Sequence, residues 1–255
     1  MEKTDLTPLI SIFSEFFTTI YRKKIDELLL VYPTKKSLYL DYLALEKYDP
    51  ELADKLIKEP DKVIEASETA IEGMNLALPS GGKFKPHVRF NDIPCQEQLI
   101  EHIGSRSINE LVAFKGVITK RAELMHRVKI AVYKCQICDS SIRVPVIKNF
   151  SPPKRCDSCK KLALKQVDEE SDFTDIQRAE VQELLERVKG GAPTAKMELL
   201  FEDDLVNTVI PGENVEVSGI LRLKAPMKMR TTPVIRSNPP KITLLLNGSI
   251  CRFIR

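Results

Sequence analysis

Two hydrophobic periods divide the chain. Up to about residue 78, apolar residues recur at helical spacing, which predicts helices with one apolar face each. The first such face comprises Leu9, Phe13, Phe16, Phe17 and Ile20, at i, i+4, i+7, i+8 and i+11. Pro50 and Pro60 each predict the first turn of a further helix, because a proline there loses no helical hydrogen bond. Between these helices, residues 37–42 are compatible with a short extended segment.

Beyond the turn-forming segment 79–83, the pattern changes to short β-rich runs separated by turn signals. These runs are 87–90, 111–118, 128–133, 197–201, 215–221 and 242–246. Gly116 and Gly219 lie inside two of them, where glycine permits sharp bending of a strand. The pattern favours a small curved barrel of the OB type, which has five strands and binds nucleic acids on one face.

The hydropathy of the chain and its N-terminal residues indicate the cellular compartment of the protein. No apolar run approaches the length of a membrane-spanning helix, and the charged start Met1–Asp5 is not typical of a secretory signal. We therefore expect an intracellular, cytoplasmic protein with no membrane partner. In a reducing compartment, cysteines are more often metal ligands or buried thiols than disulfides.

Four of the six cysteines form two CxxC pairs. Cys135 and Cys138 are followed, after seventeen residues, by Cys156 and Cys159. This separation is typical of a zinc site, since each CxxC turn directs two thiolates at one ion. With all four positions filled by cysteine, no position remains for a catalytic water, and we expect a structural Zn²⁺ in a ribbon of β-hairpins. Cys95 and Cys251 are left over, and by default they are small buried apolar residues.

The expected organisation is therefore α+β. A helical bundle occupies residues 1–82, an OB-fold β-barrel occupies 83–134 and 163–255, and an inserted four-cysteine zinc ribbon occupies 135–162. Basic residues surround the two cysteine pairs: Lys134, Arg155, Lys160 and Lys161. Two interpretations are open, because these cations either add to DNA affinity or offset the negative charge of a metal tetrathiolate.

The positive charge is concentrated at one end of the chain. Net charge is only +3, yet residues 217–255 contain no Asp or Glu and eight Lys or Arg. Such asymmetry suggests a polyanionic partner, usually nucleic acid or membrane headgroups, although a solvated basic linker would have the same composition.

Within this basic end, we expect a long β-hairpin with a cationic tip between residues 219 and 236. Its basic residues are Arg222, Lys224, Lys228, Arg230 and Arg236. Cations on a projecting hairpin can contact phosphates and release counterions. No aromatic residue lies between Gly219 and Arg252, so we expect backbone contacts with little sequence preference rather than base stacking. The alternative is an exposed loop without a ligand.

Motifs for catalysis are missing from the sequence. There is no G-x-x-x-x-G-K-[ST] motif for ATP, and the three histidines are far apart, with no HExxH. We expect no enzymatic activity from this chain alone.

Several segments resemble the N-terminal region of archaeal minichromosome maintenance (MCM) helicases. Residues 85–94 look like the strand leading into that family's barrel, and 114–121 resemble its first barrel motif. Residues 173–183 are similar to the segment after its zinc ribbon, and 202–221 are the most diagnostic stretch.

The resemblance implies a hexameric ring, in some members a double ring, with DNA in the central channel. The hairpin would project into the channel, and the zinc ribbon would contact a second ring. The loop 189–193 would communicate with the ATPase domain of the full-length helicase, which is absent here, so that we expect a fragment of a nucleoid-associated replication protein.

One departure concerns the barrel surface that binds single strands in archaeal relatives. Glu180 stands where an Arg is sometimes found, and Lys120, Arg121 and Arg127 are the candidates to replace it. Two other functions are alternatives to a DNA-binding module: an assembly scaffold with incidental DNA affinity, and an enzyme such as a nuclease or ligase. No nucleophilic lysine motif or carboxylate cluster supports an enzyme of the latter kind.

Overall fold

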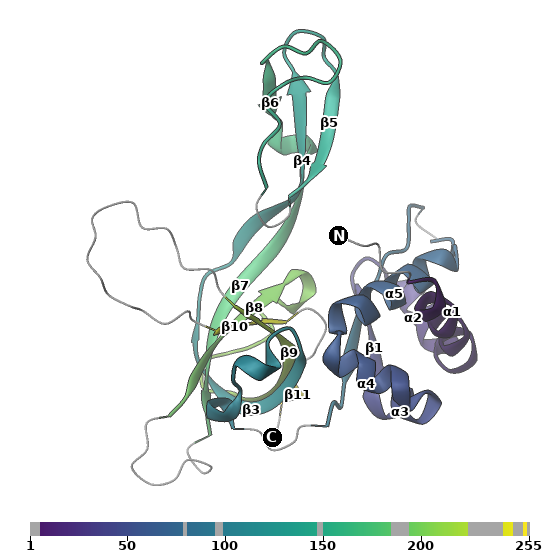
Figure 1. Cartoon of the computed structure of the whole chain (residues 1–255), viewed down its shortest axis with the longest axis vertical. Helices are drawn as coiled ribbons and strands as arrows, with labels where there is room; N and C mark the ends of the chain where they lie inside the picture. Colours follow the sequence, from purple (N-terminus) through teal and green to yellow (C-terminus); the bar gives the residue numbers. More distant parts are fainter. Residues whose placement is uncertain are drawn as a thin grey trace.

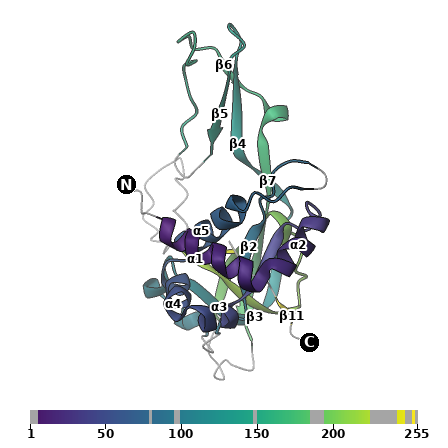
Figure 2. The ribbon, with the colours of Figure 1, turned by 90° about the vertical axis from the view of Figure 1, so that its right-hand side faces the viewer.

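The computed structural model describes residues 6–78, 81–94, 99–146, 150–184, 194–223, 242–246 and 252–253. It has a helical part, an OB-like β-sheet beside it, and a long arm of β-strands that extends away from both (Figure 1). A second view shows the helices covering one side of the sheet (Figure 2).

The helical part contains several helices within the region that was predicted to be helical. These are α1 (Thr7–Phe16), the π-helical turn η1 (Phe17–Tyr21), α2 (Arg22–Val31), α3 (Tyr42–Tyr48), α4 (Pro50–Lys58) and α5 (Pro60–Gly73). The prolines begin α4 and α5, as predicted, and the Asp49 carboxylate accepts hydrogen bonds from the first-turn amides of α4. Phe13, Phe16 and Phe17 are completely buried.

Only part of the apolar face predicted for the first helix is buried. Ile20 was expected in the core, but it is 47% exposed, and Tyr21 is buried in its place. The physical reason is the π-turn of η1, whose wider spacing rotates the following side chains relative to an α-helix.

Strands β1 (Ser37–Asp41) and β2 (His87–Asn91) form a separate parallel pair, with Leu38 opposite Val88. Val88 and Phe90 pack in the same core as the helices. This strand therefore pairs and packs with the helical part. Strand pairing between segments so far apart leaves no local signature in the sequence.

The OB-like sheet is built on β3 (Leu111–Arg121), β7 (Asp172–Glu183), β8 (Lys196–Glu202), β9 (Asn214–Leu223) and β10 (Ile242–Leu246). Each of these strands pairs with two others of the set; only β8 and β10 run parallel. A short strand, β11 (Arg252–Phe253), adds to β9. The enclosed core includes Phe114, Ile118, Val181, Leu199 and Phe201. The helices and the OB-like sheet agree with the expected fold class.

The arm is formed by β4 (Met125–Cys135), which pairs with β7 at its base and with β5 (Ser141–Pro145) and β6 (Leu164–Gln166) further out. The cysteines lie at its far end. Short 3₁₀ turns complete the described structure: η2 (Ile100–His102), η3 (Ser105–Ser107), η4 (Asp168–Glu170) and η6 (Asp203–Leu205). Among the described residues, no helix is long and apolar enough to cross a membrane.

Candidate metal centre and nucleic-acid interface

The four cysteines predicted as ligands converge on one point at the end of the arm. The sulfurs of Cys135, Cys138, Cys156 and Cys159 all lie within 4.8 Å of one another. The Sγ atoms of Cys135 and Cys159 are 3.6 Å apart, and those of Cys138 and Cys156 are 3.5 Å apart. These distances exclude disulfide bonds, since an S–S bond is about 2 Å long. Cys135 and Cys156 are buried, and the cluster is able to hold one metal ion.

The two cysteine turns have the same backbone construction. In the first turn, the amide of Asp139 donates to the carbonyl of Cys135 at 3.1 Å, and the amide of Cys135 donates to Ser140 at 2.9 Å. In the second turn, Lys160 donates to Cys156 and Cys156 donates to Lys161, both at 3.0 Å. The matched bonds direct two sulfurs from each turn toward the same point.

Ser140 is a polar neighbour that the sequence did not single out. Its hydroxyl lies 3.2 Å from Cys138 Sγ and 3.0 Å from Cys156 Sγ. Its hydrogen bond is the main cause that lowers the pKa of Cys156 to about 6, and it also lowers the pKa of Cys138. The contact therefore favours the thiolate form, which is the form that binds metals.

The cations around the cluster are exposed: Lys134, Arg155, Lys160 and Lys161. Within the part of the chain that the structure describes, no ion pair is seen for any of them. Both interpretations of these cations, DNA contact and charge compensation, stay open.

Most of the predicted hairpin lies outside the described residues. Lys224, Lys228, Arg230 and Arg236 belong to this group. The flanking strands are described: β9 and β10 pair antiparallel, with Leu223 opposite Ile242. Residues 224–241 therefore connect two adjacent antiparallel strands, and the hairpin itself stays a prediction.

Arg222, at the end of β9, contacts the helical part. Its guanidinium pairs with Asp61 on α5 and donates to Asn109 Oδ1 at 2.6 Å, and its side chain is only 17% exposed. A role for Arg222 in DNA binding stays a prediction.

The three cations predicted on the barrel surface do not form one cluster. Lys120 lies opposite Glu180 on β7, whereas Arg127 lies opposite Thr174. Six residues of strand separate these positions, about 20 Å at the usual rise. Arg127 pairs with Glu202 at 2.7 Å, and Arg121 donates to the carbonyl of Val209 at 3.0 Å.

The structure adds two cations near Lys120. Arg178 and Lys196 line the same hollow of about 620 Å³ and pair with Glu198 at 3.4 Å and Glu180 at 3.0 Å, respectively. Arg178 belongs to an alternation along β7, in which odd residues from Gln177 are buried and even ones are partly exposed. The sequence carries little sign of this alternation, because two of the buried positions are the polar residues Gln177 and Glu183.

An OB-like sheet with a four-cysteine ribbon inserted between its first two strands defines a class of zinc-ribbon OB proteins. Comparison with known families gives two adjoining matches: the MCM N-terminal domain over residues 10–109 and the MCM OB domain over residues 99–225. The chain belongs to the MCM family and corresponds to the N-terminal region of its archaeal members.

Individual relatives agree with this assignment. The minichromosome maintenance protein MCM of Saccharolobus solfataricus is 29% identical over 231 residues, covering 84% of this chain and 33% of the relative. The DNA replication licensing factor MCM4 of Arabidopsis thaliana is 24% identical over 197 residues, covering 74% of this chain and 23% of the relative. The chain thus spans a third or less of these relatives.

A solved structure covers nearly the whole fold. The crystal structure of the N-terminal domain of an archaeal MCM superposes with a TM-score of 0.78 and 25% identity. It covers 98% of this chain and 100% of that domain.

Proposed function

We propose that this chain is the DNA-binding and ring-forming module of a replicative DNA helicase, without catalytic activity of its own. The observation that carries the proposal is the joint match of both MCM domains and of the complete archaeal N-terminal fold. The names of the relatives connect the family to DNA replication. The chain lacks a phosphate-binding G-x-x-x-x-G-K-[ST] motif, so ATP hydrolysis would come from another part of the helicase.

The ion at the cysteine cluster is proposed to be zinc with a structural role. A tetrahedral site with Zn–S bonds of about 2.3 Å has S–S edges of about 3.8 Å. The observed pairs at 3.5 and 3.6 Å come close to that size. Cys135, Cys138, Cys156 and Cys159 would complete the coordination, and the bound ion would fasten the two cysteine turns to each other.

DNA contact is proposed to come mainly from the basic connection between β9 and β10, with Lys228 and Arg230 at its tip. The antiparallel pairing of β9 with β10 supports a projecting hairpin. Lys120, Arg121 and Arg127 are proposed as additional contacts from the sheet. Their carboxylate neighbours, such as Glu202 beside Arg127, predict a weaker contribution from this surface.

A scaffold that forms rings with only incidental DNA affinity is the alternative. Sedimentation velocity of the chain, alone and with fluorescent single- or double-stranded DNA, separates the two functions. The proposed function predicts that DNA sediments with a ring-sized species near physiological salt. A ring-sized species that leaves the DNA behind supports the scaffold. A monomer without DNA, even at low salt, contradicts both.

A further inference from the structure

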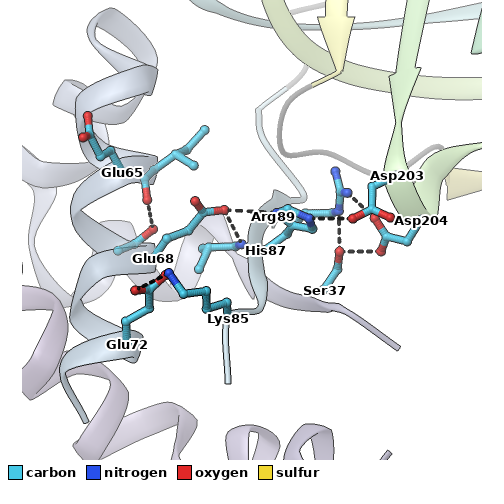
Figure 3. A network of polar contacts seen from close by, with 12 residues as sticks. Ser37, Glu65, Glu68, Glu72, Lys85, His87, Arg89, Asp203 and Asp204 are labelled. Carbon is cyan, nitrogen blue, oxygen red and sulfur yellow. Dashed lines mark hydrogen bonds and ion pairs between the residues drawn. The ribbon is translucent and has the colours of Figure 1, made fainter. Parts of the chain in front are cut away.

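The helical part and the OB-like sheet meet at a polar cluster centred on His87 of β2 (Figure 3). On one side, Nδ1 of His87 lies 3.5 Å from Oε1 of Glu68 on α5. On the other, Nε2 lies 3.0 Å from Oδ2 of Asp203 in η6, which follows β8 of the sheet. The imidazole is thus held between a carboxylate of its own part and a carboxylate of the other part.

This arrangement requires two donors from one ring. A neutral imidazole has a single N–H, so it can donate to Glu68 or to Asp203 but not to both, whereas the imidazolium donates to both. Loss of the proton therefore breaks one contact and removes the charge attraction from the other. The side chain is 31% exposed, so solvent protons reach it while screening is incomplete.

Other charged groups surround the same point. From the segment before β1, Lys36 pairs with Asp203 Oδ1 at 2.7 Å. On β2, the buried Arg89 pairs with Asp204 and donates to Ser37 Oγ at 2.6 Å. These two cations are permanent, so they keep the two parts in contact at every pH near neutrality.

Further groups line a cavity of about 260 Å³ beside His87. Arg127 and Lys129 come from β4, and Glu202 comes from the end of β8. Arg127 is neutralised by Glu202 at 2.7 Å. Glu72, near the C-terminal end of α5, pairs with Lys85 at 2.9 Å. The nearest carboxylates to His87 are therefore Glu68 and Asp203.

The electrostatics agree with the geometry. The hydrogen bond to Glu68, and then that to Asp203, raise the pKa of His87 above its ordinary 6.5, against the opposing effects of burial and Arg89. For a histidine with a raised pKa in the folded state, the extra stability is fully present below pH 6.5. It is lost as the pH rises through the raised value.

We propose that His87 is a proton-dependent link between the helical part and the OB-like sheet, which strengthens their contact when protonated and weakens it when neutral. The contact weakens without the parts separating, because Leu111, Ala113 and Ile220 of the sheet also pack in the helical core. The proton-dependent weakening is confined to the polar contacts that η6 makes with the helical part.

The test uses the whole chain and two readouts across pH 6 to 8.5. NMR titration of the three histidines gives the midpoint of His87. Hydrogen exchange, corrected for the intrinsic pH dependence, gives the protection of residues 85–91 and 199–206. We expect His87 to titrate above 6.5 and protection to fall severalfold through that midpoint.

His87→Gln should remove the pH dependence of protection, whereas the control His126→Gln should keep it, because His126 pairs with Asp175 within the sheet alone. Glu68→Gln provides a second variant that retains the histidine, and it should lower the midpoint of both readouts. The proposal is overturned if His87 titrates at or below 6.5, or if His87→Gln loses protection with pH as the native chain does. Zinc content and the exchange of the ribbon, measured on the same samples, keep this test separate from the proposed function.

Discussion

Lys160 has the same left-handed backbone conformation in the second cysteine turn that Asp139 has in the first. Their φ angles are +58° and +55°, and each residue directly follows the second cysteine of its CxxC pair. In this conformation, the amide reaches back to the carbonyl of the first cysteine of the pair. The two turns are thus equivalent halves of one metal centre, although their sequences differ outside the cysteines.

This conformation leads to a prediction at Lys160. A left-handed backbone costs an L-residue about 1–2 kcal/mol, and a β-branched residue tolerates it least. Lys160→Gly should therefore leave the ribbon as stable as before or more stable. Lys160→Val should destabilise it, because a β-branched side chain adds to a cost that Lys160 already bears. Zinc affinity measured by competition with a chelator reports both, and equal affinities for the two variants would contradict the role assigned to this turn.

The metal centre should be separable from the rest of the fold. Neither hydrophobic core contains residues of the ribbon: one is formed by the helical part with Leu111, Ala113 and Ile220 of the sheet, and the other by the OB-like sheet. Cys156→Ser should lower bound zinc from one ion per chain to about none, because a tetrathiolate site needs all four ligands. Helical circular dichroism should be unchanged. Elemental analysis checks the zinc, and Cys251→Ser, which changes neither CxxC pair, should keep its ion.

Gly116 lies on β3 at a point where β7 leaves no room for a side chain. A Cβ atom at this position would lie 2.6 Å from the carbonyl oxygen of Gln182 and 2.6 Å from a methyl group of Val181. Gly116→Ala should therefore destabilise the chain by about 1–3 kcal/mol through overpacking. At Gly104, the nearest atom would be 4.0 Å away, so Gly104→Ala is the matched control. Denaturant unfolding measures the stability of both variants, and equal stabilities would contradict this account.

The pair formed by Arg222 and Asp61 joins β9 to the start of α5. Asp61 is 56% exposed, so solvent screens the pair, and we expect a coupling free energy of about 0.2–1 kcal/mol. A double-mutant cycle with Arg222→Ala and Asp61→Ala measures that coupling. Strictly additive effects on unfolding would show that the contact does not stabilise the junction.

Local patterns predicted the elements well. Pro50 and Pro60 mark helix starts because their effect is confined to one turn, and the CxxC spacing identified the cysteine cluster because metal geometry fixes it. The partner of β2 could not be predicted in this way, since its pairing with β1 joins segments about fifty residues apart. Ile20 was misplaced because a π-turn leaves no mark in the apolar period.

The polar contacts of the site were also beyond the sequence. Arg222 was expected to face DNA, and nothing in its neighbourhood along the chain indicates Asp61, 161 positions away. Ser140, in contrast, lies two residues after a ligand cysteine, close enough for its contact to have been considered.

The central claim, that the chain binds DNA through its basic hairpin, is tested most directly by fluorescence anisotropy of labelled DNA across a salt series. The native chain is compared with Lys228→Ala/Arg230→Ala and with Lys55→Ala/Lys58→Ala, which removes the same charge from the exposed side of α4. We predict sequence-tolerant binding that weakens steeply with salt. Its logarithmic slope should be smaller by about two in the hairpin variant and unchanged in the α4 variant. No binding by the native chain at low salt, or equal binding by the hairpin variant, would contradict the account.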